Sequence, residues 1–464
     1  MTGGIWQYAY IVAAALIIAS IKWLSSPTTA RRGVHAGEVG MLLAVIGTLL
    51  RHEIVNIEWI LIAVLVGSAI GVPLAYLMPM TAVPQLTALS HAFGATAAAL
   101  VGTAEYYRYI HGGIPLSSFT ALALVAETLL GYLTATASVV AFGKLQELVP
   151  TRPVVWPGQN FFNLALLAAA IGLGGWLIVG GAPVWAFPVF IAMSLLFGIL
   201  LILPIGAGDM PTVIALLNCY AGLAAACMGL ALDNKLLVIA GALNAASGLI
   251  LSVIMCKAMN RSFTNVLFGA FGTVQATSVD QATARPVHSA TPEDAAAILA
   301  SARSVIIVPG YGMAVAQAQH KLRELTDLLV RNGAEVRFAI HPVAGRMPGH
   351  MNVLLAEADI PYDRLYEMDD INSEFSETDV ALVIGANDVV NPAARTDRQS
   401  PIYGMPILDV DKAHTVMVIK RSMSPGFAGI DNELYYMDKT LMLFGDAKAF
   451  LAQIVKEMPA QAAA

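Results

Sequence analysis

The chain has 464 residues, of which 57% are hydrophobic and 12% charged, and its formal net charge is −6. It is too long for one ordinary domain. Residues 1–256 hold 8 of the 26 Lys and Arg residues and 8 of the 32 Asp and Glu residues, which leaves 18 and 24 for the other 208 residues. The first part is therefore expected to lie in lipid and the second in water. The acidic second part shows no basic stripe and gives little support to a nucleic-acid partner.

Nine hydrophobic segments in the first part predict membrane-spanning helices. A bilayer core about 30 Å thick requires roughly 20 apolar residues in a helix. The first segment lacks a basic region before it and leads directly into further spans, so we expect a retained helix and not a secretory signal. Many Gly and Ala residues favour a compact bundle. The predicted spans are residues 8–24, 37–50, 57–79, 85–103, 119–143, 161–180, 184–204, 210–231 and 236–256.

Basic residues between these spans predict the orientation. An odd number of spans places the two termini on opposite sides of the membrane, and basic loops face the cytoplasm. Arg51, Arg108 and Lys235 fall on one side. Seven basic residues fall on the other side, with the C-terminal part, which is therefore expected in the cytoplasm. These seven are Lys22, Arg31, Arg32, Lys144, Arg152, Lys257 and Arg261.

Four polar side chains in the spans or at their ends are of functional interest. His91 is the only histidine inside a predicted span, and an imidazole changes charge near neutral pH. It either relays protons or forms a helix-packing hydrogen bond. Asn218 is similarly placed and can share a water chain with His91. Glu127 either faces a hydrated path or bonds to a neighbouring hydroxyl, and Asp209 is a candidate helix N-cap.

The three cysteines also lie within predicted spans. Cys219, Cys227 and Cys256 lack the spacing of a metal site, so we interpret them as packing residues and predict no metal.

Residues 1–260 are thus predicted to form a membrane domain, residues 261–302 a linker, and residues 303–464 a soluble domain. In the soluble domain, short β-rich runs alternate with helical patterns. This alternation predicts a Rossmann-like, doubly wound, mainly parallel sheet. The predicted strands are residues 304–309, 335–340, 379–384, 407–410 and 415–419.

The first predicted strand ends in a glycine-rich turn, Gly310-Tyr311-Gly312, which precedes an amphipathic helix that is expected to reach about residue 330. Glycines permit a tight turn and a close approach of the backbone to a pyrophosphate, which the positive end of a helix favours. The pattern alone is a weak indicator of a dinucleotide site. Its position between a strand and a helix strengthens it.

Two features favour NADP(H) over NAD(H). An NAD site normally carries a carboxylate at the end of the second strand, where it binds the ribose 2′-hydroxyl. Here that strand ends in Ile340-His341-Pro342, without an acid, and this permits a 2′-phosphate. Lys420, Arg421 and Ser422 follow another predicted strand, and two cations with a hydroxyl can hold a phosphate dianion. The alternative is a solvated basic pair.

Two further segments lie where strand ends should face a cofactor. Residues 343–350 place Arg346 between two glycines, and residues 385–392 follow a buried-type strand. Simple turns are the alternative, because Gly, Asn, Asp and Pro are turn formers.

Four blocks closely resemble the NADP(H)-binding domain of proton-translocating nicotinamide nucleotide transhydrogenase. They are PGYGMAVAQAQ at 309–319, HPVAGRMPGHMNVLLAEA at 341–358, GANDVVNPAA at 385–394 and KRSM at 420–423. The membrane part is similar to the β subunit of that family at residues 141–145, 209–211 and 255–263. The resemblance covers essentially the whole chain. It implies an α-helical polytopic membrane bundle followed by a Rossmann-like NADP(H)-binding domain.

The resemblance also implies roles for individual residues. In this family the nucleotide binds in a reversed orientation, so the glycine turn need not hold it as in an ordinary dehydrogenase. Lys420, Arg421 and Ser422 would hold the 2′-phosphate. Asp388 would lie near the nicotinamide and link the cofactor to protonation, together with His91 and Asn218. The implied cofactor-contacting residues are Gly310, Tyr311, Gly312, Val343, Ala344, Gly345, Arg346, Met347, Pro348, Gly385, Ala386, Asn387, Asp388, Val389, Gly404, Met405, Lys420, Arg421, Ser422, Met423, Ser424, Pro425, Gly426, Phe427, Asp446 and Ala447.

This chain departs from the family pattern at two positions. Phe427 stands where tyrosine is expected, and Asp411 stands where tryptophan is frequent. Neither departure touches the expected phosphate-binding residues.

The implied function is reversible hydride transfer from NADH to NADP⁺, driven by protons entering the cytoplasm across a bacterial inner membrane. One dinucleotide fingerprint is present, so NAD(H) is expected on a partner α subunit, in a dimer of the α/β assembly. A channel or transporter with a nucleotide-sensing domain is the alternative. Such a sensor would more often carry the acid after the second strand, and no TVGYG filter occurs. A membrane-anchored NADP reductase would need only one or two anchoring helices.

Overall fold

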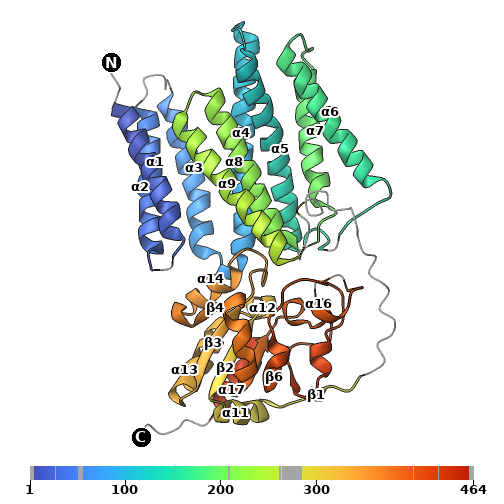
Figure 1. Cartoon of the computed structure of the whole chain (residues 1–464). Helices are drawn as coiled ribbons and strands as arrows, with labels where there is room; N and C mark the ends of the chain where they lie inside the picture. The colour runs from blue at the N-terminus through green and yellow to red at the C-terminus, as the bar shows by residue number, and fades with distance from the viewer. Residues whose placement is uncertain are drawn as a thin grey trace.

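The structure is a computed structural model that describes residues 5–26, 28–50, 56–151, 153–206, 209–260, 263, 285–400, 402–426 and 428–458. A layer of long helices stands above a smaller α/β domain (Figure 1). Arg51, Arg152, Arg261 and Phe427, which were used in the predictions above, lie outside the described residues, as do residues 264–284 of the predicted linker.

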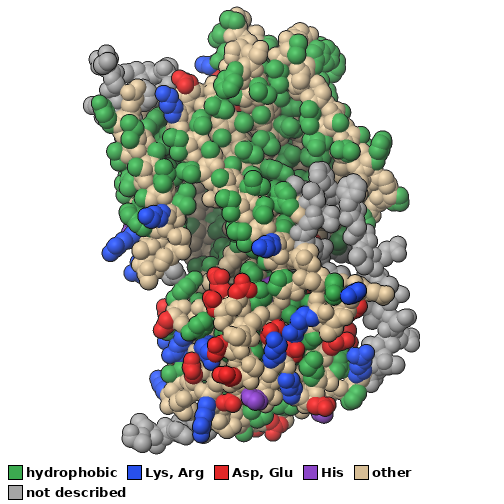
Figure 2. Space-filling model, viewed as in Figure 1, with side chains coloured by type: hydrophobic (Ala, Val, Ile, Leu, Met, Phe, Trp, Pro, Cys, Tyr) green, Lys and Arg blue, Asp and Glu red, His purple; other side chains and the backbone are tan. Residues whose placement is uncertain are grey.

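Nine helices occupy the described part of residues 5–260, one for each predicted span. Seven are long and apolar enough to cross a membrane, whereas α7 is apolar but shorter and α2 carries Arg31, Arg32 and Glu38. Hydrophobic side chains cover most of the visible face of this part (Figure 2). The predicted polytopic bundle is confirmed. The helices are α1 (Ile5–Leu24), α2 (Ala30–Leu49), α3 (Ile57–Leu77), α4 (Val83–Gly112), α5 (Ser118–Leu145), α6 (Gln159–Val179), α7 (Ala186–Ile202), α8 (Met210–Ala231) and α9 (Lys235–Ala258).

Helix α5 is the most enclosed of the seven candidate spans, with 61% of its most apolar window buried. In contrast, no residue of α3 is buried. Small residues let neighbouring helices approach closely, as expected where lipid provides no hydrophobic drive for association. At Gly248 of α9, for example, a Cβ atom would lie 2.5 Å from the backbone nitrogen of Cys219 in α8.

Seven of the ten basic residues used to predict the orientation lie near the ends of helices, and one of these seven is buried inside the protein. Lys144 lies in the last turn of α5 and is fully buried. Its Nζ donates hydrogen bonds to the carbonyl oxygens of Leu203 and Ile205, both at 2.6 Å. Its assignment to a loop was therefore wrong, because two carbonyl groups that follow α7 satisfy the ammonium group inside the protein. Six basic residues remain on that side against three on the other, so the excess of basic residues still favours the predicted orientation.

The soluble part contains a seven-stranded, entirely parallel sheet in the order β1-β7-β6-β5-β2-β3-β4. Side chains of β2 alternate between two cores, because Val305 and Ile307 lie in one and Ile306 and Val308 in the other. Both faces of the sheet are therefore buried, as the doubly wound prediction requires. The strands are β1 (His288–Ser289), β2 (Ser304–Pro309), β3 (Glu335–Ile340), β4 (Leu365–Glu367), β5 (Val380–Ile384), β6 (Thr415–Lys420) and β7 (Thr440–Phe444).

Several predicted elements differ from the structure. No strand forms at residues 407–410, where Ile407 and Leu408 are buried in loop structure and the amide of Leu408 donates to Val389. Burial of this apolar run thus does not need a strand. The sequence analysis missed β1, β4 and β7. The predicted linker contains β1 and α11 (Pro292–Ser301), so regular structure in the soluble part begins before residue 303.

The helix predicted after β2 is interrupted. Helix α12 covers only Tyr311–Val315, and α13 (Gln319–Arg331) begins after Gln317, whose φ is +49°. A helix this short gives little support to the predicted electrostatic role of its N-terminus. The other helices of this domain are α14 (His350–Glu357), α15 (Met368–Ile371), α16 (Ala393–Thr396) and α17 (Ala447–Glu457).

The loops after β2 and β5 lie at the point where the strand order reverses, which is where open α/β sheets bind ligands. Their backbones are joined by hydrogen bonds from Gly310 N to Ile384 O and from Gly312 N to Gly385 O, both at 2.9 Å. A Cβ atom at Gly310 would lie 2.5 Å from the backbone of Ala386. These glycines therefore allow two loops of the protein to pack backbone against backbone.

We expect Gly385→Ala to destabilise the soluble domain by about 2–4 kcal/mol, because an added methyl group would overlap Gly312 and φ is +66°. Gly333→Ala is the matched control: φ is +88° but no atom lies within 4 Å, so only the backbone strain of about 1 kcal/mol applies. Hydrogen exchange of β2 and β5 in the purified chain measures the difference. Equal effects of the two substitutions would refute the close-packing explanation.

Candidate functional site

The predicted cofactor residues gather at the carboxyl ends of β2, β5 and β6. Gly310 follows β2, Gly385 follows β5, and Lys420 is the last residue of β6. The amide of Gly445 donates to Lys420 O at 3.1 Å, which brings the start of α17 to the same edge. Parallel strands thus place segments that are far apart in sequence around one crevice.

The loop after β5 is held by buried polar residues that the sequence analysis did not identify. The Oδ1 atom of Asn387 accepts hydrogen bonds from the hydroxyl of Tyr435 at 2.8 Å and from Nδ2 of Asn432 at 3.1 Å. Asn432 is fully buried and Tyr435 is 1% exposed. Both lie some 45 residues from Asn387, and no local pattern marks them. The buried Nδ2 atom of Asn387 has no hydrogen-bond partner among the described residues and is a donor suited to a ligand.

The segment after Lys420 folds over Asp388. The amide of Ala428 donates to Asp388 Oδ2 at 3.0 Å, and a Cβ atom at Gly426 would lie 2.5 Å from Asp388 Oδ1. Only glycine allows this approach. The segment that contains the predicted phosphate-binding residues therefore also covers the carboxylate predicted to lie near the nicotinamide.

The cationic cluster fits a phosphate group. Arg421 is exposed, and it forms no hydrogen bond or ion pair with another described residue. The hydroxyls of Ser422 and Ser424 lie 2.9 Å apart. Lys420 donates to the carbonyl oxygen of Ser424; burial lowers the pKa of Lys420, while Asp388 and Asp431 oppose this shift. An available guanidinium beside hydroxyls is the donor set that binds phosphate oxygens.

The loop after β3 depends on two buried histidines. His341 Nε2 donates to the carbonyl oxygen of Pro406 at 2.8 Å, and His341 Nδ1 accepts from the amide of Val343 at 3.2 Å. His350 Nδ1 accepts from the amide of Arg346 at 3.0 Å. Between them Gly345 has φ of +110°, and a Cβ atom there would lie 2.5 Å from His350 Nδ1. Ala344 and Met347 are buried, and Val343 and Pro348 are partly exposed.

Arg346, predicted to contact the cofactor, lies against a membrane helix in the structure. It is 5% exposed, and its Nη1 atom donates to the carbonyl oxygen of Leu145, at the end of α5, at 2.8 Å. Its Nη2 atom is 3.4 Å from the carboxylate of Glu147, and its guanidinium lies 4.3 Å from the ring centroid of Tyr311. A predicted cofactor loop is thus in direct contact with the membrane part.

A second predicted cofactor segment also touches the membrane part. The Nδ2 atom of Asn260, just after α9, donates to the carbonyl oxygen of Tyr403 at 3.0 Å. Gly404 has φ of +78°, and a side chain there would overlap Asn260, while Met405 is buried. At the start of α17, Asp446 accepts from the amide of Ala449 at 3.1 Å and so caps the helix, and Ala447 is buried.

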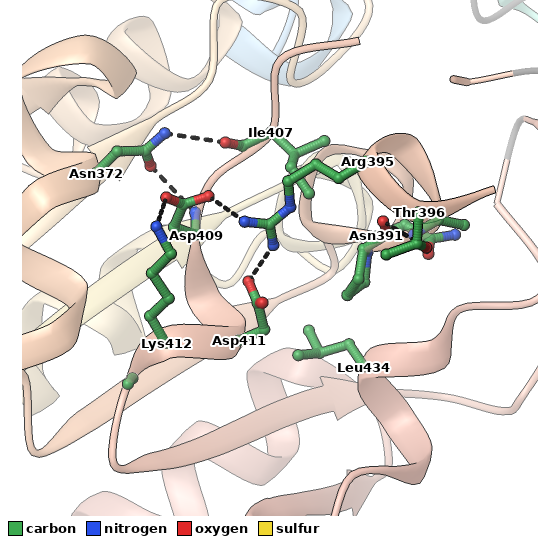
Figure 3. A network of polar contacts seen from close by, with 12 residues as sticks. Asn372, Asn391, Arg395, Thr396, Ile407, Asp409, Asp411, Lys412 and Leu434 are labelled. Carbon is green, nitrogen blue, oxygen red and sulfur yellow. Dashed lines mark hydrogen bonds and ion pairs between the residues drawn. The ribbon is translucent and has the colours of Figure 1, made fainter. Parts of the chain in front are cut away.

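Asp411, one of the two departures from the family pattern, belongs to an ion-pair network (Figure 3). Arg395 pairs with Asp411 and, at 2.8 Å, with Asp409, which also accepts from Lys412 at 2.7 Å. Asn372 Nδ2 donates to the carbonyl oxygen of Ile407 at 3.0 Å. These contacts hold residues 407–412 without a strand.

In the membrane part, the side chain of His91 in α4 faces that of Asn218 in α8. Asn218 and Asn244 of α9 also exchange hydrogen bonds between side chain and backbone. Asp209 occupies the N-cap position of α8, but its side chain makes no capping hydrogen bond. Cys219, Cys227 and Cys256 are free thiols.

We expect acid to destabilise the loop after β3. Burial lowers the pKa of His341 from 6.5 to about 4, although its hydrogen bond to the carbonyl oxygen of Pro406 opposes this shift, and burial also lowers the pKa of His350 to about 4. The neutral form of His341 should therefore contribute about 3 kcal/mol that is fully present above pH 6.5 and lost as the pH falls toward 4. His341→Gln should weaken this pH dependence in calorimetric unfolding, and Gln at the exposed His320 should leave it unchanged. Identical pH profiles for both variants would contradict this assignment.

The comparison with known proteins covers both parts of the chain. A model of the NAD(P) transhydrogenase beta subunit family matches residues 6–457. Two curated sequences from Rhodospirillum rubrum, each named NAD(P) transhydrogenase subunit beta, are 51% identical to the chain over 464 residues. These matches cover 99% of this chain and 100% of each relative. Since the match includes the helices and the sheet alike, the chain belongs to the NAD(P) transhydrogenase beta subunit family.

Proposed function

We propose that this chain is the NADP(H)-binding, proton-translocating subunit of a nicotinamide nucleotide transhydrogenase. The observation that carries the proposal is the pair of hydrogen bonds that the carbonyl group of Leu145 accepts. This group accepts hydrogen bonds from Arg346, in a predicted cofactor loop, and from Nε2 of Gln85 at 3.4 Å. Gln85 belongs to α4, the helix that carries His91. One acceptor therefore links the candidate nucleotide site to the helix of the candidate proton site.

The crevice at the ends of β2, β5 and β6 would hold NADP(H). Lys420, Arg421 and Ser422 would bind the 2′-phosphate, and the unpartnered amide of Asn387 would donate to the bound nucleotide. When bound, NADP(H) supplies the nicotinamide carbon that accepts or donates hydride. The chain itself would position this carbon, exclude water and keep the Asp388 carboxylate nearby.

The second nucleotide would be supplied by a partner. We propose that NADH binds a separate α subunit, which presents it to this chain for direct hydride transfer, within a dimer of the α/β assembly. The membrane would be a bacterial inner membrane, and the positive-inside rule supports a soluble domain on its cytoplasmic side. Reduction of NADP⁺ by NADH would then accompany proton movement into the cytoplasm.

Proton movement and hydride transfer would be coupled through changes in the affinity for NADP(H). Protonation at His91 would change the affinity of the soluble site for NADP(H), and nucleotide occupancy would change the proton affinity in return. A tenfold change in affinity corresponds to about 1.4 kcal/mol, and one charge crossing 100 mV releases about 2.3 kcal/mol. One proton is therefore enough to bias the exchange.

Arg421→Ala should weaken NADPH binding about 10- to 100-fold, since a charge-assisted hydrogen bond contributes roughly 1.5–3 kcal/mol. NADH binding should change little, because NADH lacks the 2′-phosphate. Titration of the purified chain with each nucleotide measures both constants. Arg331→Ala, at an exposed position at the end of α13, is the control. If Arg421→Ala leaves the preference for NADPH intact, the phosphate assignment is wrong.

His91→Asn should abolish the coupled movement of protons across the membrane, because the amide cannot exchange a proton at this site. The measurement is NADH-dependent reduction of NADP⁺ in sealed vesicles, with and without the NAD(H)-binding partner, while internal pH is followed. His111→Asn is the control, because His111 lies at the exposed end of the same helix. Proton uptake at the wild-type rate in the His91 variant would refute the scheme.

A further inference from the structure

A row of polar residues lies inside the membrane part on one face of α5. Glu127, Thr134 and Ser138 are spaced by seven and four residues, which places them on the same side of the helix. All three are fully buried. Both carboxylate oxygens of Glu127 and the hydroxyl oxygens of Thr134 and Ser138 have no hydrogen-bond partner among the described residues.

Other buried hydroxyl groups of the membrane helices form hydrogen bonds within their own helix. Thr128 donates to the carbonyl oxygen of Leu124 at 2.7 Å, and Ser194 donates to that of Phe190 at 2.8 Å. This bond to the residue four positions earlier is open to serine and threonine in any helix. Thr134 and Ser138 do not make it, so their hydroxyls remain available to bind water or to pass a proton.

Helix α4 leaves space for the carboxyl group of Glu127. Opposite Glu127 stands Gly102, where a Cβ atom would lie 2.9 Å from the carboxyl carbon and 3.1 Å from Oε1. Beyond it on α4, Glu105 forms an ion pair with Arg108 at 2.7 Å. Glu105 is therefore neutralised by a neighbour, whereas Glu127 has no cation paired with it in the described chain. An ionisable group placed in this way within a membrane helix is characteristic of a proton pathway.

The packing of α4 against α5 places His91 near the other end of the row. A Cβ atom built at Gly102 would lie 3.1 Å from the hydroxyl of Thr128, and one built at Gly131 would lie 2.9 Å from Ala99. Gln85 donates a hydrogen bond to the carbonyl oxygen of Leu145. In this antiparallel register His91 is level with Ser138 and Val139. The Nδ1 atom of His91 is likewise buried without a partner among the described residues. Eleven residues separate Glu127 from Ser138, which is about 16 Å along the helix.

We propose that Glu127 is a second proton-binding site, located in the half of the membrane away from the soluble domain, and that it exchanges protons with His91 along Thr134 and Ser138. The Glu127 carboxyl group releases a proton, bridging water and the two hydroxyls pass it on, and the His91 imidazole accepts it. A proton from the far side of the membrane then restores the carboxyl group, and no other bond changes. This inference rests on the proposed function.

The test uses the full chain with its NAD(H)-binding partner in sealed vesicles. Glu127→Gln keeps the shape of the side chain but cannot exchange a proton, so proton uptake and the NADP⁺ reduction coupled to it should fall at least tenfold. NADPH binding should remain within twofold of wild type. Glu127→Asp, which restores a carboxyl group, should recover part of the lost proton uptake. Glu105→Gln is the matched control and should retain wild-type rates.

A second variant avoids reliance on one substitution. Thr134→Val combined with Ser138→Ala keeps Glu127 but removes both hydroxyls, and it should also slow proton uptake without changing NADPH binding. Wild-type proton uptake in Glu127→Gln, or an equal loss in Glu105→Gln, would overturn the inference. If Glu127→Gln pumps normally while His91→Asn does not, the inference fails and the proposed function stands. If the wild-type chain neither binds NADPH nor takes up protons, the proposed function itself fails.

Discussion

The carbonyl oxygen of Leu145 is a hydrogen-bond acceptor that the two parts of the chain share. The last carbonyl groups of any helix lack partners within that helix and must be satisfied from elsewhere. At the end of α5 the donors are Gln85 of α4 and Arg346 of the soluble domain. The guanidinium of Arg346 is nearly buried, so it also requires acceptors. Moving the soluble domain away would take Arg346 from its acceptors and leave the Leu145 carbonyl with Gln85 as its donor.

The same arginine contacts a residue of the candidate nucleotide crevice. Its guanidinium packs on Tyr311, which belongs to the glycine turn after β2, and that turn is joined to the loop after β5 through Gly312 and Gly385. A continuous set of contacts therefore runs from α4 to the point where the strand order reverses. These contacts physically connect the candidate nucleotide crevice with the membrane helices.

Prediction from sequence succeeded where periodicity and length are decisive. Each of the nine spans became a helix in the described residues, and four of the five predicted strands formed. It failed where burial is achieved by loops: residues 407–410 are mostly apolar yet form no strand, and Arg395 and Asn372 hold the segment in place. Short strands at or near the edge, β1 and β4, lack the length that periodicity needs. Lys144 appeared to be a loop cation because its two carbonyl partners follow α7, about 60 residues later.

Sequence patterns alone predict the division into a membrane part and a soluble part, the parallel sheet, and the glycine and Lys-Arg segments at the edge of that sheet. These features depend on hydrophobic length, alternation and residue type, all of which are local. Three other features are visible only in the folded chain: Arg346 contacts α5, Asn432 and Tyr435 bond to Asn387, and the hydroxyls of Thr134 and Ser138 make no local bond. Those facts depend on which distant groups meet, and no local pattern specifies the partner of a buried donor or acceptor.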